Sequence, residues 1–312
     1  MSDISRREAL DFHSKNRPGK IEVVPTKRYR SQRDLALAYS PGVAEPCKSI
    51  SKRKSDVYKY TAKSNLVGVI TNGSAVLGLG NIGPEAAKPV MEGKGLLFKI
   101  YADIDVFDIE LDASDVESFV SAVKALAPTF GGINLEDIKA PECFEIEKRL
   151  VEELSIPVMH DDQHGTAIIS AAALINSLEL VNKSIDKVKI VVNGAGAAAI
   201  SCLKLYIRLG VKRKNIILCD SQGVIRKDRD NLPKEKKRFA TNRRVHTLAD
   251  AMKNSDVFIG LSIGNIVTQK MLKTMNKNPI VFAMANPDPE ISYLDARKAR
   301  KDAILATGRS DF

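Results

Sequence analysis

Short apolar runs alternate with polar, amphipathic stretches along most of the chain, a pattern that predicts alternating strands and helices. In the first half, the apolar runs are as long as buried strands and lie at residues 65–71, 75–79, 96–101 and 156–159. Helical spacing of apolar residues lies at residues 2–15, at 114–127 behind the capping pattern Ser114-Asp115-Val116-Glu117, and from Pro141 onward. Residues 20–26 are expected to be extended.

From Gly165 onward the alternation becomes regular. Strands are expected at residues 188–192, 215–219, 256–261, 280–284 and 303–306. Helices are expected at residues 166–181, between the first two of these strands up to Gly210, and from Thr247 and Thr268. Strands and helices that alternate at this pitch predict a parallel, doubly wound sheet.

The length of 312 residues exceeds what one typical core holds, so two domains are expected. The change of pattern places the boundary near residues 162–166. The predicted fold is therefore α/β, with a mixed α/β N-terminal domain over residues 1–162. A doubly wound, parallel-sheet Rossmann domain follows over residues 163–312.

Two glycine-rich loops have the spacing that commonly cradles a dinucleotide pyrophosphate. V-L-G-L-G-N-I-G contains Gly78, Gly80 and Gly83, and G-A-G-A-A-A contains Gly194 and Gly196, with Ala199 in the third position. The second loop lies between a predicted strand and a full helix. Asp220 follows Gly194 by 26 residues, near where an acid meets a ribose hydroxyl. We expect this loop to hold the nucleotide; a tightly packed turn is the alternative.

The first glycine loop has poorer surroundings for a pyrophosphate. Its helix contains Pro84 and Pro89 and is expected to stop at Gly93-Lys94-Gly95. The strand predicted after it runs into a group of acids at Asp103, Asp105, Asp108, Glu110 and Asp112. Negative charge there would repel a pyrophosphate, so these glycines are expected to serve close packing and to leave a helix N-terminus facing a small anion.

Composition narrows the possible partners. The net charge of +10 is concentrated in residues 226–244, which hold nine Lys or Arg against three acids. Tryptophan is absent and aromatics are 5%, which leaves few platforms for stacking nucleic-acid bases. We interpret the stretch as steering an anionic substrate and cofactor, with a solvated lysine-rich face as the alternative. No nucleic-acid partner is expected.

The compartment is predicted from cysteine usage and apolar runs. The four cysteines are scattered, without C-x-x-C spacing or a disulfide framework. No apolar run approaches the ~20 residues of a membrane-spanning helix, and the N-terminus lacks the apolar core of a signal peptide. A reducing cytoplasm without membrane association is the expectation.

Two acidic motifs, N-L-E-D at 134–137 and H-D-D-Q-H-G-T at 160–166, each follow an apolar run. Glu136, Asp137 and one of Asp161 or Asp162 would form a site of three carboxylates, and oxygen ligands suit Mg²⁺ or Mn²⁺. The H-x₃-H spacing of His160 and His164 suggests zinc, but no thiolate or third histidine is nearby. Solvated loop charges are the remaining alternative.

Eight motifs in order along the chain strongly resemble a malic enzyme. They are L-A-L-A-Y-S-P-G-V-A (35–44), V-L-G-L-G-N-I-G (76–83), M-E-G-K (91–94), N-L-E-D, H-D-D-Q-H-G-T, G-A-G-A-A-A (194–199), A-N-P-D-P-E (285–290) and A-T-G-R-S-D-F (306–312). The resemblance is to the small bacterial type, often NADP-linked and sometimes fused to a phosphotransacetylase-like domain. It implies oxidative decarboxylation of (S)-malate to pyruvate and CO₂, with reduction of NAD(P) and a divalent metal. It also implies a homodimer or higher homo-oligomer.

The resemblance assigns roles in the catalytic and metal-binding domain. Glu136, Asp137 and Asp162 match the ligands of Mg²⁺ or Mn²⁺. Lys94 matches the general base; a free lysine, with a pKa of about 10.4, needs burial or a nearby cation to act as one. Asp161 matches the acid that orients this lysine, and Tyr39 the residue that donates a proton to C3 of enolpyruvate.

The resemblance also assigns the cofactor site. Gly194, Ala195, Gly196 and Ala197 would hold the pyrophosphate through backbone N–H groups. Asn286 matches an asparagine that contacts substrate and the nicotinamide side of the site. Asp220 alone favours NAD, whereas the basic stretch that begins at Arg226 and the small-type resemblance favour NADP.

Two departures from the family pattern qualify this assignment. Ala75 stands where larger members carry an arginine, so another group would have to meet the second carboxylate of malate. The family also continues beyond T-G-R-S-D-F into an asparagine-rich stretch and a closing helix. The expectation is therefore a C-terminally incomplete nucleotide domain, either a fragment or a copy that lost part of its site. A truncated regulatory or assembly module is the non-enzymatic alternative.

Overall fold

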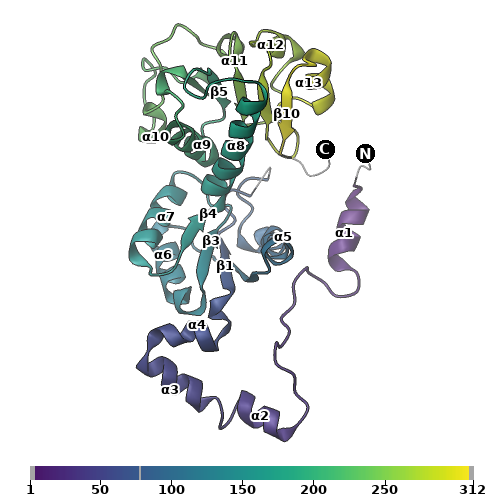
Figure 1. Cartoon of the computed structure of the whole chain (residues 1–312), viewed down its shortest axis with the longest axis vertical. Helices are drawn as coiled ribbons and strands as arrows, with labels where there is room; N and C mark the ends of the chain where they lie inside the picture. Colours follow the sequence, from purple (N-terminus) through teal and green to yellow (C-terminus); the bar gives the residue numbers. More distant parts are fainter. Residues whose placement is uncertain (1–3, 77–78, 309–312) are drawn as a thin grey trace. The chain divides into compact units, whose positions relative to one another are not determined.

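A computed structural model describes residues 4–76 and 79–308 (Figure 1). The chain divides into two compact units, one ending at Met159 and the other beginning at His160. The first contains α1 (Arg6–Ser14), α2 (Gln32–Ala38), α3 (Ala44–Lys52), α4 (Val57–Tyr60), β1 (Leu66–Thr71), α5 (Pro84–Ala102), β2 (Asp105–Glu110), α6 (Val116–Leu126), β3 (Gly132–Leu135), α7 (Glu142–Glu153) and β4 (Val158–His160). Short 3₁₀ turns lie at Lys54–Asp56, Ala62–Ser64 and Ala127–Thr129.

The sheet of the first unit has the strand order β2-β1-β3-β4, and β1 pairs in parallel with both β2 and β3. Central β1 and β3 are almost wholly buried, as their continuous apolar sequences predict. Helix α5 packs on β1 and β2 through Ala87, Met91 and Gly95, which recur every four residues on one face. This sheet places the ends of β3 and β4 side by side.

Helices α1, α2 and α3 contain no buried residue. The chain between α1 and α2 is bonded to α5 through Lys20, whose backbone N–H donates to Glu92 Oε2 at 2.9 Å. The ammonium of Lys20 also donates to the carbonyl of Pro89 at 2.7 Å. Residues 20–26, predicted as extended, form no strand and pair with none of the strands within residues 4–76 and 79–308.

The second unit contains the nucleotide-type fold. Its elements are α8 (Asp161–Leu180), β5 (Ile190–Asn193), α9 (Ala197–Arg208), β6 (Ile216–Asp220), β7 (Gly223–Val224), α10 (Lys234–Lys237), α11 (Leu248–Met252), β8 (Val257–Gly260), α12 (Gln269–Lys273), β9 (Ile280–Ala283), α13 (Tyr293–Ala299) and β10 (Ile304–Thr307), with a 3₁₀ turn at Arg213–Asn215. The strand order is β10-β9-β8-β5-β6-β7. All neighbouring strands pair in parallel except β6 with β7.

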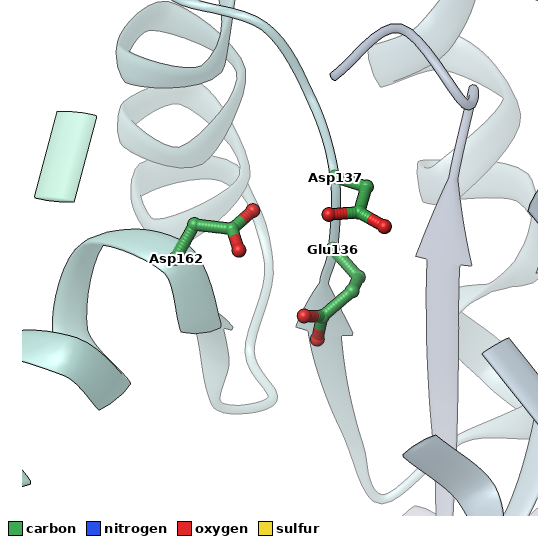
Figure 2. Close-up of side chains that lie close together, drawn as sticks. All are labelled: Glu136, Asp137 and Asp162. Carbon is green, nitrogen blue, oxygen red and sulfur yellow. The ribbon is translucent and has the colours of Figure 1, made fainter. Parts of the chain in front are cut away.

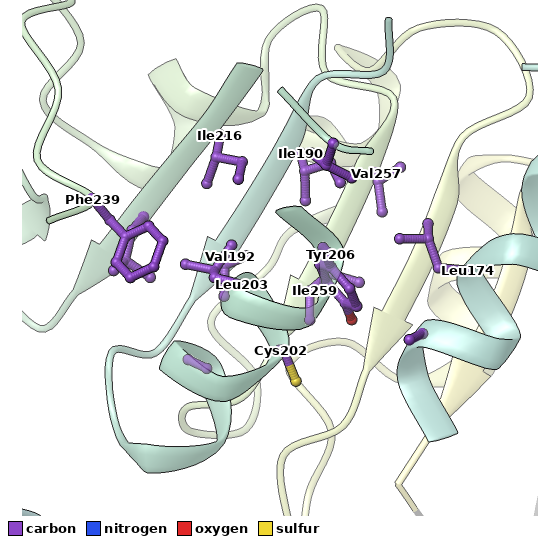
Figure 3. Close-up of a cluster of buried hydrophobic side chains, with 14 of the residues drawn as sticks. Leu174, Ile190, Val192, Cys202, Leu203, Tyr206, Ile216, Phe239, Val257 and Ile259 are labelled. Atoms are coloured by element: carbon purple, nitrogen blue, oxygen red, sulfur yellow. The ribbon is translucent and has the colours of Figure 1, made fainter. Parts of the chain in front are cut away.

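Apolar clusters cover both faces of this sheet, as a doubly wound sheet requires. One cluster joins α8 and α9 to the sheet through Leu174, Leu203 and Tyr206 (Figure 3). The hydroxyl of Tyr206 donates to Ser170 Oγ at 2.8 Å and thereby ties α9 to α8. The α/β fold class, with a Rossmann-type second sheet, is confirmed.

Three local predictions for the first unit are wrong. Residues 96–101, predicted as a strand, are the last turns of α5, which continues through Gly93 and Gly95 instead of stopping there. Gly95 lets the helix approach the sheet, since a Cβ there would lie 3.3 Å from Val106 Cγ1. The strand lies instead in the acidic stretch as β2, at the sheet edge, where Lys88 pairs with Asp108 at 2.7 Å and Glu110 at 3.1 Å.

The strand predicted at 75–79 is not formed by its described residues. Val76 makes an isolated antiparallel bridge with Gly80, and residues 77 and 78 lie outside the described residues. The third error is the N-cap of α6: Asp115, not Ser114, caps this helix, by accepting from the N–H of Ser118 at 2.9 Å.

In the part of the chain that the structure describes, no helix is both long and apolar enough to cross a membrane.

Candidate metal centre and nucleotide loop

Three carboxylates meet just past the ends of two neighbouring strands of the first sheet. Glu136 and Asp137 follow β3, and Asp162 stands in the first turn of α8, directly after β4. One carboxylate oxygen of each lies within 4.8 Å of the others. Figure 2 shows Asp162 directed toward Glu136 and Asp137. The structure thus brings together the three acids that the motifs N-L-E-D and H-D-D-Q-H-G-T supply.

Burial and backbone conformation set these acids apart from solvated loop charges. Glu136 is 5% and Asp137 is 3% exposed. Asp137 has a φ of 53°, in the left-handed region that side chains with a Cβ rarely adopt, and its carbonyl accepts from the N–H of Ala75 at 3.0 Å. Buried like charges repel one another unless a cation compensates them. The backbone therefore holds a carboxylate where charge alone would disfavour it.

Glu136 is bonded on both oxygens. Lys94 Nζ lies 3.2 Å from Oε1, and the amide of Asn134 donates to Oε2 at 2.7 Å. Lys94 lies in the middle of α5, and its side chain is 23% exposed. The predicted base and a predicted metal ligand are therefore in direct contact.

The start of α8 shapes the other side of the cluster. A Cβ at Gly165 would lie 2.1 Å from Asp161 Oδ1, so the missing side chain at this position makes room for the Asp161 carboxylate. His160 is fully buried, and its Nε2 lies 3.7 Å from Asp162 Oδ2. The pairing of Asp161 with Lys94 stays a prediction.

Tyr39 is placed differently from the other predicted catalytic residues. It caps the C-terminus of α2, and the residue is 72% exposed. The structure therefore does not enclose Tyr39 with the carboxylate cluster, and its proton-donor role stays a prediction.

The donor set of the cluster fits a hard divalent cation. Three carboxylates supply only oxygen ligands, which suit Mg²⁺ or Mn²⁺ better than zinc. Among residues 4–76 and 79–308, no group of three metal-type side chains includes His160 or His164. The zinc alternative from the H-x₃-H spacing is therefore without structural support.

The second glycine loop lies where the strand order of the second sheet reverses, between β5 and β8. Gly194 has a φ of 106°, and a Cβ there would lie 2.1 Å from the carbonyl oxygen of Leu261, which follows β8. Gly196 caps α9, whose first turn, beginning at Ala197, contains no acid. Ala195 lies between the two glycines. The first-turn N–H groups of α9 thus form a helix N-terminus suited to a phosphate group.

The first glycine loop is a local turn. The N–H groups of Ile82 and Gly83 donate to the carbonyl of Gly73 at 3.1 and 3.2 Å. A Cβ at Gly73 would lie 2.0 Å from the carbonyl oxygen of Gly83, so this glycine serves close packing. Gly83 caps α5, and Pro84 removes an N–H from the helix start. Gly78 lies outside the described residues.

Asp220, the last residue of β6, is bonded by cations. Arg229 donates to its two oxygens at 2.9 and 3.0 Å, and Lys236 Nζ lies 3.4 Å away. Burial alone would raise the pKa of Asp220, but Arg229, the N–H of Gln222 and Lys236 hold this pKa below its usual value. Asp220, the acid from which the sequence predicts a preference for NAD, is thus ionised and paired with Arg229 and Lys236.

Asn286 and Glu290 lie in the loop after β9. Asn286 Nδ2 donates to the carbonyls of Met284 and Gly308 at 3.4 and 3.3 Å. Glu290 is fully buried and accepts from the N–H groups of Ser262 and Ala285, each at 3.0 Å. Burial raises the pKa of Glu290, against the effect of these N–H groups. Its carboxylate joins the loops that follow β8 and β9.

Sequence reasoning missed two of these side chains. Asn134 lies in β3, two residues before Glu136, and its amide donates to the Glu136 carboxylate; the two-residue period of an extended chain was the signal that could have found it. Glu290 closes the motif A-N-P-D-P-E, but nothing in its spacing indicated that the carboxylate would be buried against two backbone N–H groups.

A Rossmann-type sheet with a glycine loop at its switch point, together with a carboxylate cluster beside a lysine, is the arrangement expected of a nucleotide-dependent, metal-dependent oxidoreductase. The family described as "Malic enzyme, N-terminal domain" matches residues 18–151, and "Malic enzyme, NAD binding domain" matches residues 163–310. The chain belongs to the malic enzyme family.

Several relatives are similar over the whole chain. The NADP-dependent malic enzyme of Haemophilus influenzae is 58% identical over 100% of this chain and 42% of that protein. That of Halomonas elongata is 53% identical over 100% of this chain and 74% of that protein. The chain thus spans less than half the length of the first of these.

Solved structures agree in fold. The NAD-dependent malic enzyme of Thermotoga maritima superposes with a TM-score of 0.89 at 45% identity, over 99% of this chain and 82% of that one. The malic enzyme of Pyrococcus horikoshii gives a TM-score of 0.91 at 44% identity, over 98% and 74%.

Proposed function

We propose that the chain catalyses oxidative decarboxylation of (S)-malate to pyruvate and CO₂, with reduction of NADP and dependence on Mg²⁺ or Mn²⁺. The observation that carries the proposal is the contact of Lys94 with Glu136 in a cluster of three carboxylates, two of which are buried. Relatives named as NADP-dependent malic enzymes support the choice of substrate and cofactor. In this proposal residues 1–162 form the catalytic and metal-binding domain, and residues 163–312 bind the nucleotide.

The chain's own residues then take the following roles. Glu136, Asp137 and Asp162 hold the cation, which when bound polarises the hydroxyl and carboxylate of malate as a Lewis acid. Lys94 takes the proton of the C2 hydroxyl while the hydride at C2 passes to the nicotinamide. Asp161 orients Lys94, and Asn134 fixes the rotamer of Glu136.

After the bond between C3 and the C4 carboxylate breaks and CO₂ leaves, a proton from Tyr39 at C3 completes pyruvate. Gly194, Ala195, Gly196 and Ala197 bind the pyrophosphate of the cofactor through backbone N–H groups. Asn286, at the carboxyl end of β9, contacts the substrate and the nicotinamide side of the site.

An assay of this chain with malate tests the proposal, using NADP and NAD in parallel, with and without Mn²⁺. Pyruvate, CO₂ and NADPH should appear in equal amounts, and only with the cation. Asp137→Asn should abolish this turnover and the tight binding of Mn²⁺, whereas Asp112→Asn, an exposed acid of the same unit, should change neither. Oxaloacetate accumulating without CO₂ would disprove the reaction. Cofactor binding without turnover would favour a non-catalytic module.

We further propose that the chain forms a homodimer or higher homo-oligomer in which the N-terminal segment, residues 4–53, packs on a second copy. This segment buries no residue in its three helices, yet it exposes large apolar side chains. They are Ile4, Leu10, Phe12, Ile21, Val23, Val24, Tyr29, Leu35, Leu37, Tyr39 and Val43. Self-association would remove this apolar surface from water and cover Tyr39.

Light scattering tests the assembly. Leu37→Asp, at a side chain that is 63% exposed on α2, should lower the measured mass to that of one chain. Val151→Asp places the same charge at a comparably exposed position on α7, 53% exposed, and should leave the mass unchanged. A wild-type chain that is monomeric at all concentrations would exclude the proposal.

We also propose a cytoplasmic location. All four cysteines are free thiols, which supports a reducing compartment.

A further inference from the structure

We infer that a basic hollow at the amino end of β6 binds a small polyanion that carries two or more phosphate groups. The hollow has a volume of about 590 Å³, within the range of roughly 300–1,000 Å³ that is typical of small-molecule sites. It is separate from the proposed nucleotide loop, and the inference does not rest on the proposed function.

The topology separates this hollow from the glycine loop. β5 and β6 are parallel, and the glycine loop begins at Gly194, directly after β5. The hollow is lined by Ile216, the first residue of β6, and by Arg213 and Lys214 in the turn before this strand. The two sites therefore lie at opposite ends of the same pair of strands, so a ligand in one does not occupy the other.

The backbone and the core of the second unit hold the hollow in place. The N–H of Lys227 donates to the carbonyl of Thr241, and the N–H of Thr241 donates to the carbonyl of Ile225, each at 3.0 Å. Phe239 and Ala240, which also line the hollow, are buried members of the core on one face of the sheet (Figure 3). The hollow is therefore a fixed feature of the fold.

Four cations and no acid line the hollow. The cations are Arg213, Lys214, Lys227 and Arg243. Arg243 donates to the carbonyl of Lys214 and so joins two of the lining segments. The guanidinium carbon of Arg213 lies 6.0 Å from the centre of the Phe239 ring, a cation–π distance that holds this charge beside the buried ring. Guanidinium groups held in this way present N–H groups to the oxygens of a phosphate.

The acids beside the hollow are paired with other cations. Asp186 pairs with Lys212, directly before the turn, at 2.9 Å, and Asp228, next to Lys227, pairs with Arg226 at 2.8 Å. Among the residues that the structure describes, none of the four lining cations forms an ion pair. Their like charges repel one another, and an anion in the hollow would compensate them.

The number of cations favours a polyphosphate over a simple acid. A dicarboxylate would leave two of the four cations uncompensated, whereas linked phosphates bring more charge and several acceptor oxygens for each group. The residue Phe239 is 7% exposed, so its ring offers no open face for stacking a base. Charge therefore dominates recognition. Lys227 and Arg243 of the basic stretch 226–244 are then part of a binding site and not of a solvated lysine-rich face.

Calorimetry of the full chain with inorganic tripolyphosphate, in the absence of divalent cations, tests the inference. The wild-type chain should bind one tripolyphosphate, and saturating NADP should not displace it. The double variant Lys214→Ala/Lys227→Ala should weaken this binding by about 10–100-fold, because two charged contacts are lost. Neither ammonium group bonds to another described residue, so the double variant should unfold as the wild type does.

The matched control is Lys270→Ala/Lys273→Ala, which removes the same charge from two exposed lysines of α12 and should bind tripolyphosphate as the wild type does. Asn242→Asp places an acid in the lining and should abolish binding. Absence of binding by the wild type, or an equal loss in the two double variants, overturns the inference. Displacement by NADP also overturns it, because the tripolyphosphate would then occupy the glycine loop. Failure of NADP itself to bind counts against the proposed function and leaves the result of the double variants decisive for the hollow.

Discussion

The ends of the strands in the two sheets carry opposite kinds of chemistry. Beyond β3 and β4, the first sheet gathers charged side chains: Glu136, Asp137 and Asp162, with Lys94 in contact. Beyond β5, the second sheet presents backbone at Gly194 and Gly196, and its acids are already compensated. Asp220 is bonded by Arg229, and Glu290 by backbone N–H groups. In the proposed function, the end of the first sheet holds a cation and the end of the second sheet holds an anion.

The two glycine loops also differ in what their glycines pack against. Gly194 is required because the loop touches the backbone after a neighbouring strand, at Leu261. Gly73 and Gly83 instead contact each other within one turn. Spacing of glycines alone does not distinguish these cases; a contact with the adjacent strand at the switch point does. The following predictions test the contrast, from the largest expected effect to the smallest.

Removing the lysine from the first sheet should have the largest effect. Lys94→Ala should lower kcat by about 10²–10⁴-fold, the range of a general base, while cofactor affinity stays unchanged. Lys99→Ala, an exposed lysine on the same helix, paired at 2.6 Å with Asp103, is the matched control and should be fully active. Stopped-flow turnover and cofactor fluorescence give the two readouts. Turnover of Lys94→Ala close to wild type would remove the catalytic assignment.

A methyl group at each glycine of the second loop should separate folding from binding. Gly194→Ala should destabilise the chain by about 1–3 kcal/mol for the left-handed backbone, plus about 1–3 kcal/mol for overpacking against Leu261. Gly196→Ala has no atom within 4 Å of its new Cβ and should cost only about 0.5–1 kcal/mol, for the poorer N-cap of α9. It should nevertheless weaken nucleotide binding. Equal behaviour of the two variants in urea unfolding would contradict this account.

Loss of the Asn134 amide, which supports the proposed ligand Glu136, should weaken Mn²⁺ binding less than loss of a ligand does. Asn134→Ala removes the hydrogen bond to Glu136 Oε2 and should weaken Mn²⁺ binding by about 10–100-fold, as loss of a supporting contact does. Electron paramagnetic resonance of free Mn²⁺ measures the affinity. Asn65→Ala, at an exposed amide before β1, should have no effect. An unchanged Mn²⁺ affinity in Asn134→Ala would show that the rotamer of Glu136 needs no such support.

Asp256, at the amino end of β8 and far along the strand from the glycine loop, should affect stability but not catalysis. Asp256, just before β8, pairs with Lys183 at 2.9 Å. Burial alone would raise the pKa of Asp256, but the N–H of Lys189, Asn276 and Lys183 hold this pKa below its usual value. Asp256→Asn should therefore cost about 1–3 kcal/mol at pH 7 and leave KM unchanged.

The pH dependence of that cost follows from the lowered pKa. The stabilisation is present above the unfolded pKa of about 3.9 and is lost as pH falls through the lower folded value. Urea unfolding at pH 7 and near pH 3 should show the difference between wild type and Asp256→Asn shrinking in acid. Asp230→Asn, an exposed acid, should show no such difference at either pH.

The second unit could be predicted closely from the sequence because its strands are buried on both faces. The continuous apolar run at 188–192 predicted β5, and the run at 280–284 predicted β9. In the first unit β2 is an edge strand of acids, and α5 presents only a narrow apolar stripe to the sheet. Residues 96–101 therefore have the apolar composition typical of a strand, although they belong to α5.

The site was only partly accessible to sequence reasoning. Motif order identified Glu136, Asp137, Asp162 and Lys94, and the structure places them together. The pairing of Asp220 with Arg229 depends on how the loop after β7 folds back, which no local pattern encodes. The position of Tyr39 depends on what covers the exposed segment that carries it.

The left-handed backbone at Asp137 has a genetic consequence. Asparagine and glycine tolerate this conformation at least as well as aspartate does, and each is one base change away from either aspartate codon. A single mutation would thus remove the charge of a proposed metal ligand without straining the backbone at this position. Such alleles would encode chains that fold but bind the cation weakly. If the chain assembles with itself, they would also enter mixed assemblies with working copies and act as dominant-negative subunits.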